Sequence, residues 1–521
     1  MSARLPERRR LLQAAAVLAA AAAMPAWRVI AQPHFGKNPF SLGVASGYPQ
    51  PEAVSLWTRL APEPLQGGGM PEAAVPVRWE IAADERFRKI VSRGEVMAVP
   101  AFAHAVHVLA TGLQPARHYW YRFHAGGSTS PVGRTRTAPA AEARNDRFTF
   151  AFASCQHYEH GFFAAYRDMA RRDLDVVIHL GDYIYESSWG RRQFVRHHDA
   201  PEPYTLTDYR NRYALYKTDP HLQAAHAAFP WLVTWDDHEV DNDYANDRSQ
   251  DLDPVGEFLQ RRAAAYQAWY EHMPMPPGLY QGGPNMKIYG SHAFGQLAQL
   301  QLLDMRQYRD YHVCSRKSRG GGGNQVNIKD CPQLATPGRS LLGAVQERWL
   351  EHSLAASAGQ WNIVAQTTLM AQADREPGPE KIVYTDGWDG YPLAREKLLR
   401  YLRDRKIRNP VVIGGDVHFA SANDLRIDFD KPKTPAVAAE FVCTSISSFG
   451  PSRARVDAYL DENPHAKFAN GTRRGYTHCV VTPKHWETVF MGVINPADEG
   501  SKVHELARCV VENGIPGTQR L

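Results

Sequence analysis

The sequence contains few cysteines and almost no excess of charge. Its six cysteines in 521 residues are too few for the disulfide scaffold of a small secreted protein. The formal net charge is +5, and residues 1–31, with five arginines and one glutamate, account for +4 of it, which leaves about +1 for the remainder. A nearly neutral protein lacks the basic surface that binds nucleic acids or acidic membranes. We therefore expect no stable nucleic-acid partner.

The sequence also lacks an uninterrupted apolar stretch of the roughly 20 residues that span a membrane. Near its start, Arg8-Arg9-Arg10 precedes a shorter, Ala-rich run from Leu11 to Ala23. This order is typical of a twin-arginine export signal, with cleavage expected after Val29-Ile30-Ala31; the alternative is a retained anchor. We therefore predict a signal peptide over residues 1–31, passage through the twin-arginine export machinery, and a periplasmic or secreted protein without a membrane span.

Residues 38–140 show an all-β pattern. The short predicted strands, separated by Gly/Pro turns, are Val54–Trp57, Val75–Ile81 and His118–Phe123. The stretch Gly112-Leu113-Gln114-Pro115 followed by Tyr119 resembles the tyrosine corner of a fibronectin-type or immunoglobulin-like sandwich. Because the segment does not gather ionisable groups, we predict an N-terminal β-sandwich domain that serves packing and spacing.

Residues 146–521 alternate between predicted strands and helices, which indicates an α/β domain with a layered core. Continuous apolar runs bounded by polar loops predict strands buried on both faces at Phe148–Ser154, Leu174–Leu180, Trp231–Trp235, Trp361–Gln366 and Pro410–Ile413. Apolar residues at helical spacing predict helices over Glu257–His272, Val345–Ser357 and Ala394–Ile407. The length remaining after a cleaved signal exceeds what one core usually serves, so we expect either two domains or one large elaborated domain.

Four of the predicted strands end in ionisable side chains. The four strand ends are Ser154-Cys155-Gln156-His157, Gly181-Asp182-Tyr183-Ile184-Tyr185, Asp236-Asp237-His238-Glu239 and Gly414-Gly415-Asp416-Val417-His418. In open α/β sheets, ligands bind beyond the carboxyl ends of the strands, so these four ends can converge on one site. One such end alone would be weak evidence, because Gly-Asp is common in turns and a lone cysteine is usually a buried thiol. Four together favour a shared site.

The residue types at these strand ends indicate metal binding. The thiolate of Cys155 and the phenolate of Tyr185 are anionic donors that suit a transition metal such as Fe(III). Asp182, Asp237 and Asp416 offer the hard oxygens preferred by Ca²⁺, Mg²⁺ or Mn²⁺. Asp182 can bridge two ions. Two cations a few ångströms apart hold both the attacking and the leaving oxygen of a phosphoryl displacement, so the pattern indicates a phosphoesterase.

The same motifs resemble the metallophosphatase signature in the variant found in the PhoD family. The similarity covers nearly the whole mature chain and includes Asn38–Gly47, Leu56–Leu60, His221–Glu239 and Leu303–Arg309. It implies a β-sandwich ahead of a four-layer αββα metallophosphatase sandwich. It also implies an Fe(III) and Ca²⁺ cofactor, with two calcium ions expected. The activity implied is that of an alkaline phosphatase and phosphodiesterase acting on phosphate mono- and diesters.

The resemblance also implies roles for individual residues. It assigns the iron to Cys155, Asp182, Tyr185 and His418, and the calcium side to Asp182, Asp237 and Asp416. The Gly-Asp-x-x-Tyr spacing is similar to that of purple acid phosphatases and favours Tyr185 over Tyr183 as the ligand. Where other metallophosphatases have Asn before the motif histidine, this chain has Asp237, which favours a hard ion. The downstream stretch Asp241-Asn242-Asp243 either adds oxygens to a second calcium or forms a polar turn.

His238 and Arg210 are the predicted catalytic residues. The resemblance implies that His238 contacts the phosphate or protonates the leaving oxygen, which an imidazole can do near neutral pH; the alternative is that it orients a metal ligand. Arg210, Arg212 and Arg306 are candidates to reach phosphate oxygens, although most arginines are solvated or structural.

Two other functions fit the same pattern. One is a phosphodiesterase dedicated to a polymer such as teichoic acid, a phospholipid or a nucleic acid, since the same cluster of ligands serves both kinds of ester. The other is an exported, calcium-stabilised binding protein. Cys155, Tyr185 and His418 argue against the latter, because calcium-only sites use oxygen ligands. We expect phosphate esters as the substrates and a monomeric protein.

The cysteines outside the strand ends allow one disulfide. Cys314 and Cys331 flank a polar loop that contains Gly320–Gly323. A disulfide formed there after export would contribute about 3 kcal/mol in the chain-entropy model; the alternative is two free thiols. We expect small buried residues at Cys443, Cys479 and Cys509; the alternative is that two of them form a disulfide pair near the end of the chain.

Overall fold

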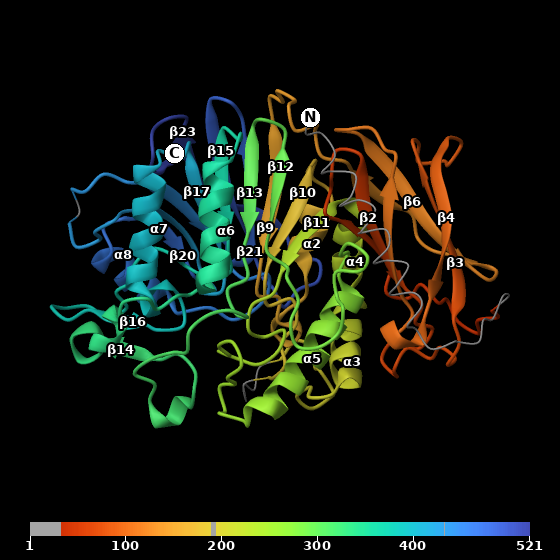
Figure 1. Cartoon of the computed structure of the whole chain (residues 1–521), viewed down its shortest axis with the longest axis horizontal. Helices are drawn as coiled ribbons and strands as arrows, with labels where there is room; N and C mark the ends of the chain where they lie inside the picture. The colour runs from red at the N-terminus through yellow and green to blue at the C-terminus, as the bar shows by residue number, and fades with distance from the viewer. Residues whose placement is uncertain (1–32, 189–193, 432) are drawn as a thin grey trace, which may run out of the picture.

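The computed structural model describes residues 33–188, 194–431 and 433–521, and Figure 1 shows their arrangement. The predicted signal peptide and its cleavage site therefore lie outside the described residues. Most of the chain forms two large mixed sheets with helices packed against them. No helix among the described residues is long and apolar enough to cross a membrane.

The larger sheet has ten strands. In order across the sheet they are β24 (Gln519–Arg520), β23 (Val503–Glu512), β22 (His485–Val493), β21 (Arg474–Val481), β9 (Phe148–Ala153), β10 (Val176–Leu180), β11 (Pro230–Thr234), β1 (Val44–Gly47), β2 (Ala53–Arg59) and β5 (Ala105–Thr111). Strands β9, β10 and β11 are parallel, and every residue in them is buried. This agrees with the continuous apolar runs in the sequence, because a parallel strand covered on both faces has no polar side.

The second sheet has seven strands. Their order is β12 (Gly290–Phe294), β13 (Ala298–Leu302), β15 (Trp361–Ala365), β17 (Pro410–Gly414), β19 (Ala438–Val442), β18 (Ala420–Leu425) and β20 (Ala466–Asn470). Strands β13, β15, β17 and β19 are parallel. Two small segments that pair with each other lie in loops: β14 (Gln325–Asn327) in the loop after β13, and β16 (Ile382–Tyr384) in the loop after β15.

Alternate residues of the second sheet pack in opposite directions. Ile363 of β15 belongs to the same buried core as Phe150 of β9 and Ile178 of β10, so the two sheets pack face to face. Its neighbour Val364 packs instead in a core with Leu350 of α6 (Gly343–Ala355). Figure 1 shows α6 and α7 (Pro392–Asp404) along this outer face of the sheet.

The helices fall into two groups. On the ten-stranded side the chain forms α2 (Ala164–Met169), α3 (Leu206–Lys217), α4 (Pro220–Ala228) and α5 (Val255–His272); on the seven-stranded side it forms α6 (Gly343–Ala355), α7 (Pro392–Asp404) and α8 (Arg453–Glu462). The Tyr166 ring of α2 lies 5.7 Å from Trp231 of β11, and the His226 ring of α4 lies 3.9 Å from it. The three helices predicted from the sequence are confirmed as α5, α6 and α7, with ends shifted by two or three residues at most.

The predicted N-terminal strands are also present, but the N-terminal segment shares a sheet with the rest of the chain. A five-stranded sheet contains β4 (Ile90–Ala98), β3 (Val75–Ala82), β6 (His118–Ala125), β7 (Ser128–Thr129) and β8 (Gly133–Arg136). It packs on β2 and β5, and the common core includes Leu56 and Tyr121. The phenol oxygen of Tyr119 accepts the N–H of Gln114 at 2.8 Å, the contact expected of a tyrosine corner. Because β1 pairs in parallel with β11, the second layer of this segment continues into the ten-stranded sheet.

Candidate metal centre

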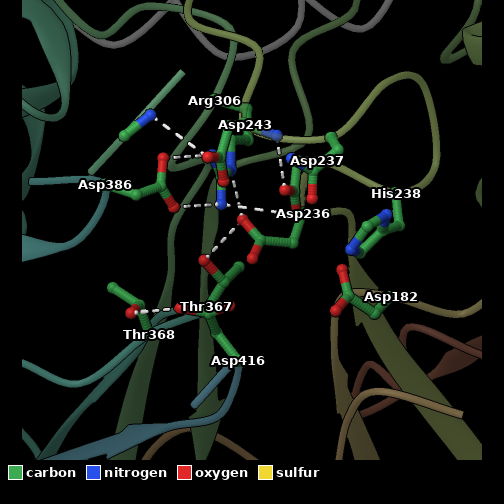
Figure 2. Close-up of polar contacts among 12 residues, drawn as sticks. Asp182, Asp236, Asp237, His238, Asp243, Arg306, Thr367, Thr368, Asp386 and Asp416 are labelled. Atoms are coloured by element: carbon green, nitrogen blue, oxygen red, sulfur yellow. Dashed lines mark hydrogen bonds and ion pairs between the residues drawn. The ribbon is translucent and has the colours of Figure 1, made fainter. Parts of the chain in front are cut away.

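The six predicted ligands come from strand ends in both large sheets. Cys155 follows β9, Asp182 follows β10 and Asp237 follows β11, which are neighbours in the ten-stranded sheet. Asp416 and His418 follow β17 of the seven-stranded sheet. The two packed sheets therefore deliver ligands to one place from opposite sides, as Figure 2 shows for Asp182 and Asp416.

The backbone of four of these ligands is left-handed. Cys155, Asp182, Asp416 and His418 have φ angles of 59°, 56°, 63° and 59°. Such a conformation costs a residue with a side chain about 1–3 kcal/mol and concentrates at functional sites. At Gly181, with φ 93°, an added Cβ would lie 2.5 Å from the Cβ of Asp236, so only glycine fits between the two strand ends. The sharp turns therefore depend on the packing around them.

One half of the centre contains the sulfur and phenol donors. Ligand atoms of Cys155, Asp182 and His418 lie within 4.8 Å of one another. The Tyr185 phenol oxygen is 2.9 Å from Oδ2 of Asp182 and 3.2 Å from Nε2 of His418. Ser448 donates a hydrogen bond to the same phenol oxygen at 2.9 Å. The structure therefore brings all four predicted iron ligands together.

His418 is held in the tautomer that a metal ligand needs. Its Nδ1 lies 2.6 Å from the carbonyl oxygen of Phe449, so Nδ1–H donates there and the lone pair of Nε2 faces Tyr185. Burial is the main cause that lowers the pKa of His418 to about 3, and the nearby Arg474 guanidinium contributes to the same shift. This shift favours the neutral imidazole, the form that binds a metal.

The other half of the centre is acidic. Ligand atoms of Asp182, Asp237 and His238 also lie within 4.8 Å of one another, so Asp182 belongs to both halves. Oδ1 of Asp182 and Oδ1 of Asp237 are buried without a hydrogen-bond partner in the described structure. A buried carboxylate oxygen without a donor is costly, and a cation would satisfy it.

Two threonines orient the acidic side chains. Thr368 donates to Oδ2 of Asp416 at 2.8 Å, and Thr367 donates to Oδ1 of Asp236 at 2.9 Å. Both contacts are visible in Figure 2, on the side of the centre opposite His238. Because each threonine follows β15, a fifth strand end contributes to the site.

Arg306 lies behind the acidic half and is fully engaged. It is 1% exposed and pairs with Asp236 at 2.5 Å and, through two nitrogens, with Asp386 at 2.8 and 2.9 Å. A third, longer ion pair reaches Oδ1 of Asp237 at 3.4 Å without hydrogen-bond geometry. Arg306 therefore positions carboxylates and is not available to a phosphate.

The electrostatics of the centre favour a bound cation. Burial raises the pKa of Asp182 and of Asp416 well above 3.8, and nearby carboxylates, Asp237 among them, raise both further. Burial and the carboxylate of Asp182 likewise raise the pKa values of the Cys155 thiol and the Tyr185 phenol. These shifts favour the protonated forms of the groups, and a bound cation would favour their anionic forms. Thiolate, phenolate, carboxylate and neutral imidazole together form a donor set that fits metal ions.

His238 lies between the two halves. Its Nδ1 is 2.6 Å from Oε2 of Glu186, and its ring stacks on Tyr185 with centroids 4.2 Å apart. Burial by itself would lower the pKa of His238, but the carboxylates of Glu186, Asp237 and Asp182 outweigh it and raise the pKa well above 6.5. This environment favours the protonated form of His238 beside the acidic half.

Comparison with known proteins then identifies the family. The family model of the PhoD-like phosphatase matches residues 150–490, and that of the N-terminal domain of PhoD-like phosphatases matches residues 23–139. Alkaline phosphatase D of Bacillus subtilis (strain 168) is 45% identical over 531 residues, covering 99% of this chain and 89% of that protein. A solved structure described as the structure of PhoD is 46% identical and superposes with a TM-score of 0.89, covering 94% of this chain and 93% of that one.

The chain belongs to the PhoD-like phosphatase family. It is thus a member of a family of phosphoric ester hydrolases, and the family and enzyme class predicted from the strand-end motifs are confirmed. The α/β fold is confirmed as well.

Two of the arginines predicted to reach phosphate are occupied elsewhere in this PhoD-like phosphatase. Arg210 pairs with Glu271 of α5 at 2.5 and 2.7 Å and donates to the carbonyl oxygen of Ala101. Arg212 donates to backbone carbonyl oxygens, including that of Glu186 at 2.8 Å. Among the described contacts, Arg212 reaches the predicted ligand Tyr185 only at its backbone carbonyl oxygen, and Arg210 reaches none of the predicted ligands. The geometry therefore gives no support to a catalytic role for Arg210.

The side chains of Asp241 and Asp243, the candidate ligands of a second calcium ion, interact with other groups of the protein. Asp241 pairs with Arg261 at 3.1 Å and accepts the N–H of Gln250 at 3.1 Å. Oδ2 of Asp243 accepts hydrogen bonds from the phenol of Tyr384 at 3.0 Å and from two further donors described below. The alternative prediction of an exposed polar turn does not fit these two residues, since both are at most 5% exposed.

Sequence reasoning missed several residues that shape the centre. Glu186 could have been suspected, because it directly follows Tyr185 in a strand-end motif. Thr367 and Thr368 directly follow the predicted strand Trp361–Gln366. Nothing in the sequence around Asp386 indicates its role, because its partner Arg306 is 80 residues away in the chain.

Proposed function

We propose that this protein is an exported, metal-dependent alkaline phosphatase and phosphodiesterase that hydrolyses phosphate mono- and diesters. The observation that carries the proposal is Asp182, which belongs to two candidate metal-binding groups: one with Cys155 and His418, the other with Asp237 and His238. A carboxylate shared between a sulfur-containing group and an acidic group is what a centre of two unlike metal ions requires.

The donor types support a particular pair of metals. Cys155, Asp182, Tyr185 and His418 would hold Fe(III), whereas Asp182, Asp237 and Asp416 would face Ca²⁺, with a second calcium ion also proposed. The bound ions would supply positive charge to the attacking and leaving oxygens of the ester. That the chain is a calcium-stabilised binding protein is less well supported, because a thiol and an imidazole are poor calcium ligands.

The protein's own groups would orient the substrate and move a proton. The Nδ1–H of His238 donates a hydrogen bond to Glu186, and this bond fixes the orientation of the ring. Its Nε2 then faces the acidic half, where it can contact a phosphoryl oxygen or protonate the departing alkoxide. Tyr185 packs against one face of the His238 ring and helps to exclude water from it.

The remaining parts of the proposal concern the fold and location. The packing of helices outside two face-to-face sheets supports a four-layer αββα sandwich, and the five-stranded sheet with β2 and β5 supports an N-terminal fibronectin- or immunoglobulin-like sandwich over residues 38–140. The Arg8-Arg9-Arg10 motif supports export through the twin-arginine machinery to the periplasm or the medium. We propose a monomer without a stable nucleic-acid partner.

Metal analysis combined with two chromogenic substrates tests this function. The purified protein should contain iron and calcium and should release nitrophenol from both p-nitrophenyl phosphate and bis(p-nitrophenyl) phosphate, faster at alkaline than at acidic pH. Turnover of the diester alone would instead favour a dedicated phosphodiesterase. A metal-free protein with full activity would overturn the proposal.

A further inference from the structure

A loop closed by a disulfide packs against the acidic half of the centre. The disulfide predicted between Cys314 and Cys331 is confirmed, and it encloses the glycine-rich stretch Gly320–Gly323. From this loop the N–H of Gly323 donates to Oδ2 of Asp243 at 3.1 Å, and the Arg319 guanidinium pairs with the same oxygen. Loop residues thus supply two of the three hydrogen bonds that this oxygen accepts.

The glycines allow the loop to approach this closely. A Cβ at Gly322 would lie 3.0 Å from Oδ2 of Asp243, and a Cβ at Gly323 would lie 2.7 Å from the Cβ of Asp386. Neither glycine has a positive φ angle, so space and not backbone conformation is the requirement. The glycine run therefore has a packing role beside two buried carboxylates.

Asp243 transmits this contact to a candidate metal ligand. Its backbone N–H donates to Oδ2 of Asp237 at 2.7 Å, and its own φ angle of 53° is left-handed. A strained residue keeps its conformation only when its surroundings fix it, and here the loop fixes its side chain. The remaining oxygen of Asp237, Oδ1, is the buried one without a hydrogen-bond partner. The loop, together with the ion pair from Arg306, thus helps to fix the direction in which that oxygen points.

A second path joins the same loop to the centre. His312, two residues before the disulfide, has Nδ1 2.9 Å from the carbonyl oxygen of Gly321 and Nε2 2.7 Å from Asp386. Asp386 in turn pairs with Arg306 behind Asp236 and Asp237. Both paths begin within the disulfide-closed segment and end at the acidic half.

We propose that the disulfide-closed loop 314–331 acts as a brace, meaning that it fixes the position of Asp243 and, through Asp243, that of Asp237 in the acidic half of the centre. An intact Cys314–Cys331 bond is then needed for tight binding of a divalent cation there. Reduction by a dithiol proceeds by thiol–disulfide exchange: the S–S bond gains two electrons and two protons and becomes two thiols, while the dithiol is oxidised to its cyclic disulfide. The loop then gains conformational freedom, and Arg319 and Gly323 hold Asp243 less well. The inference rests on the proposed metal centre.

The test compares oxidised protein, protein reduced with dithiothreitol, and the double variant Cys314→Ser/Cys331→Ser. Hydrogen exchange in the metal-free protein should be faster after reduction in peptides containing Gly320–Gly323 and Asp243, and unchanged around Cys155. Calcium affinity measured by titration calorimetry should fall by about 10–100-fold, the usual effect of losing a residue that orients a metal ligand. Iron content should stay the same.

Three controls make the test specific. Dithiothreitol should have no effect on the double variant, because the other four cysteines are free and buried. Arg319→Gln keeps the disulfide but removes the ion pair to Asp243, so it should reproduce the loss of calcium affinity even if the cysteine variant does not fold. Arg508→Gln, which breaks surface ion pairs with Glu487 and Glu505, should change nothing.

The outcomes separate the brace from the metal centre itself. Unchanged exchange at Gly320–Gly323 and Asp243 after reduction would overturn the brace, whatever the metal content. If the oxidised protein binds no calcium at all, the proposed centre is wrong, while faster exchange would still show that the disulfide holds Asp243. Equal calcium affinity in oxidised, reduced and Arg319→Gln protein would show that the loop does not act on the cation.

Discussion

Replacing Tyr185 with phenylalanine removes one oxygen from the centre and leaves the ring in place. That oxygen contacts Asp182 at 2.9 Å, Ser448 at 2.9 Å and His418 at 3.2 Å. In the metal-free protein the change leaves buried partners unsatisfied, so the free energy of unfolding should fall by about 1–3 kcal/mol. In the loaded protein it removes a ligand, so iron affinity should fall by more than the roughly 10–100-fold typical of a residue that only orients a ligand.

Tyr183→Phe is the matched control, because Tyr183 belongs to the same strand end and is also buried. Its phenol lies 2.7 Å from Nε2 of His226, away from the centre. Both variants should therefore lose similar stability without metal, as measured by urea unfolding. Only Tyr185→Phe should lose iron and the broad visible absorption that a phenolate gives when bound to Fe(III). An unchanged spectrum and iron content in Tyr185→Phe would refute the ligand assignment and return Tyr183 as the candidate.

Other predictions concern calcium, the proton donor, pH and the buried arginine. Exhaustive treatment with EGTA should abolish turnover, and added calcium should restore it; full activity in protein shown to be free of calcium would contradict this. His238→Ala should lower kcat by about 10²–10⁴-fold with metal content intact, whereas loss of metal would make His238 a ligand. Because the pKa values of Asp182 and Asp416 are raised in the folded state, they favour folding only while protonated. That contribution is complete below about pH 4 and is lost as pH rises through the folded pKa values, so the difference in Tm between metal-loaded and metal-free protein should widen from pH 4 to 8. Arg306→Ala removes the ion pairs of the buried Asp236 and Asp237 and should lower the free energy of unfolding by about 3–5 kcal/mol in thermal or urea melts; a loss below 1 kcal/mol would show that the network is not stabilising.

The strands and ligands were predictable because their signals are local. Five continuous apolar runs correspond to β9, β10, β11, β15 and β17, since a strand buried on both faces must be apolar throughout. Their carboxyl ends meet wherever the strands pack in parallel, so the motifs around Cys155, Asp182, Asp237 and Asp416 could be assigned to one site from the sequence.

What could not be predicted depends on contacts between distant segments. Whether Arg210 faces a phosphate or a carboxylate is decided by Glu271 on another helix, and nothing near Arg210 in the sequence indicates that partner. The same holds for Arg306, whose surroundings include Asp236 and Asp386 from separate loops. A guanidinium on a long side chain can reach many positions, so its role is fixed only by the folded neighbourhood.

The pairing of β1 with β11 has a consequence for any shortened form of this protein. Ser46 and Gly47 lie beside Pro230 and Trp231, on the strand that leads to Asp237. A chain beginning at residue 146 would leave β11 as a sheet edge, with apolar faces and unpaired backbone groups open to other molecules. Such an edge promotes aggregation. The N-terminal hundred or so residues therefore cover the edge of β11, the strand that leads to Asp237. Their removal is expected to yield insoluble protein and not a smaller enzyme.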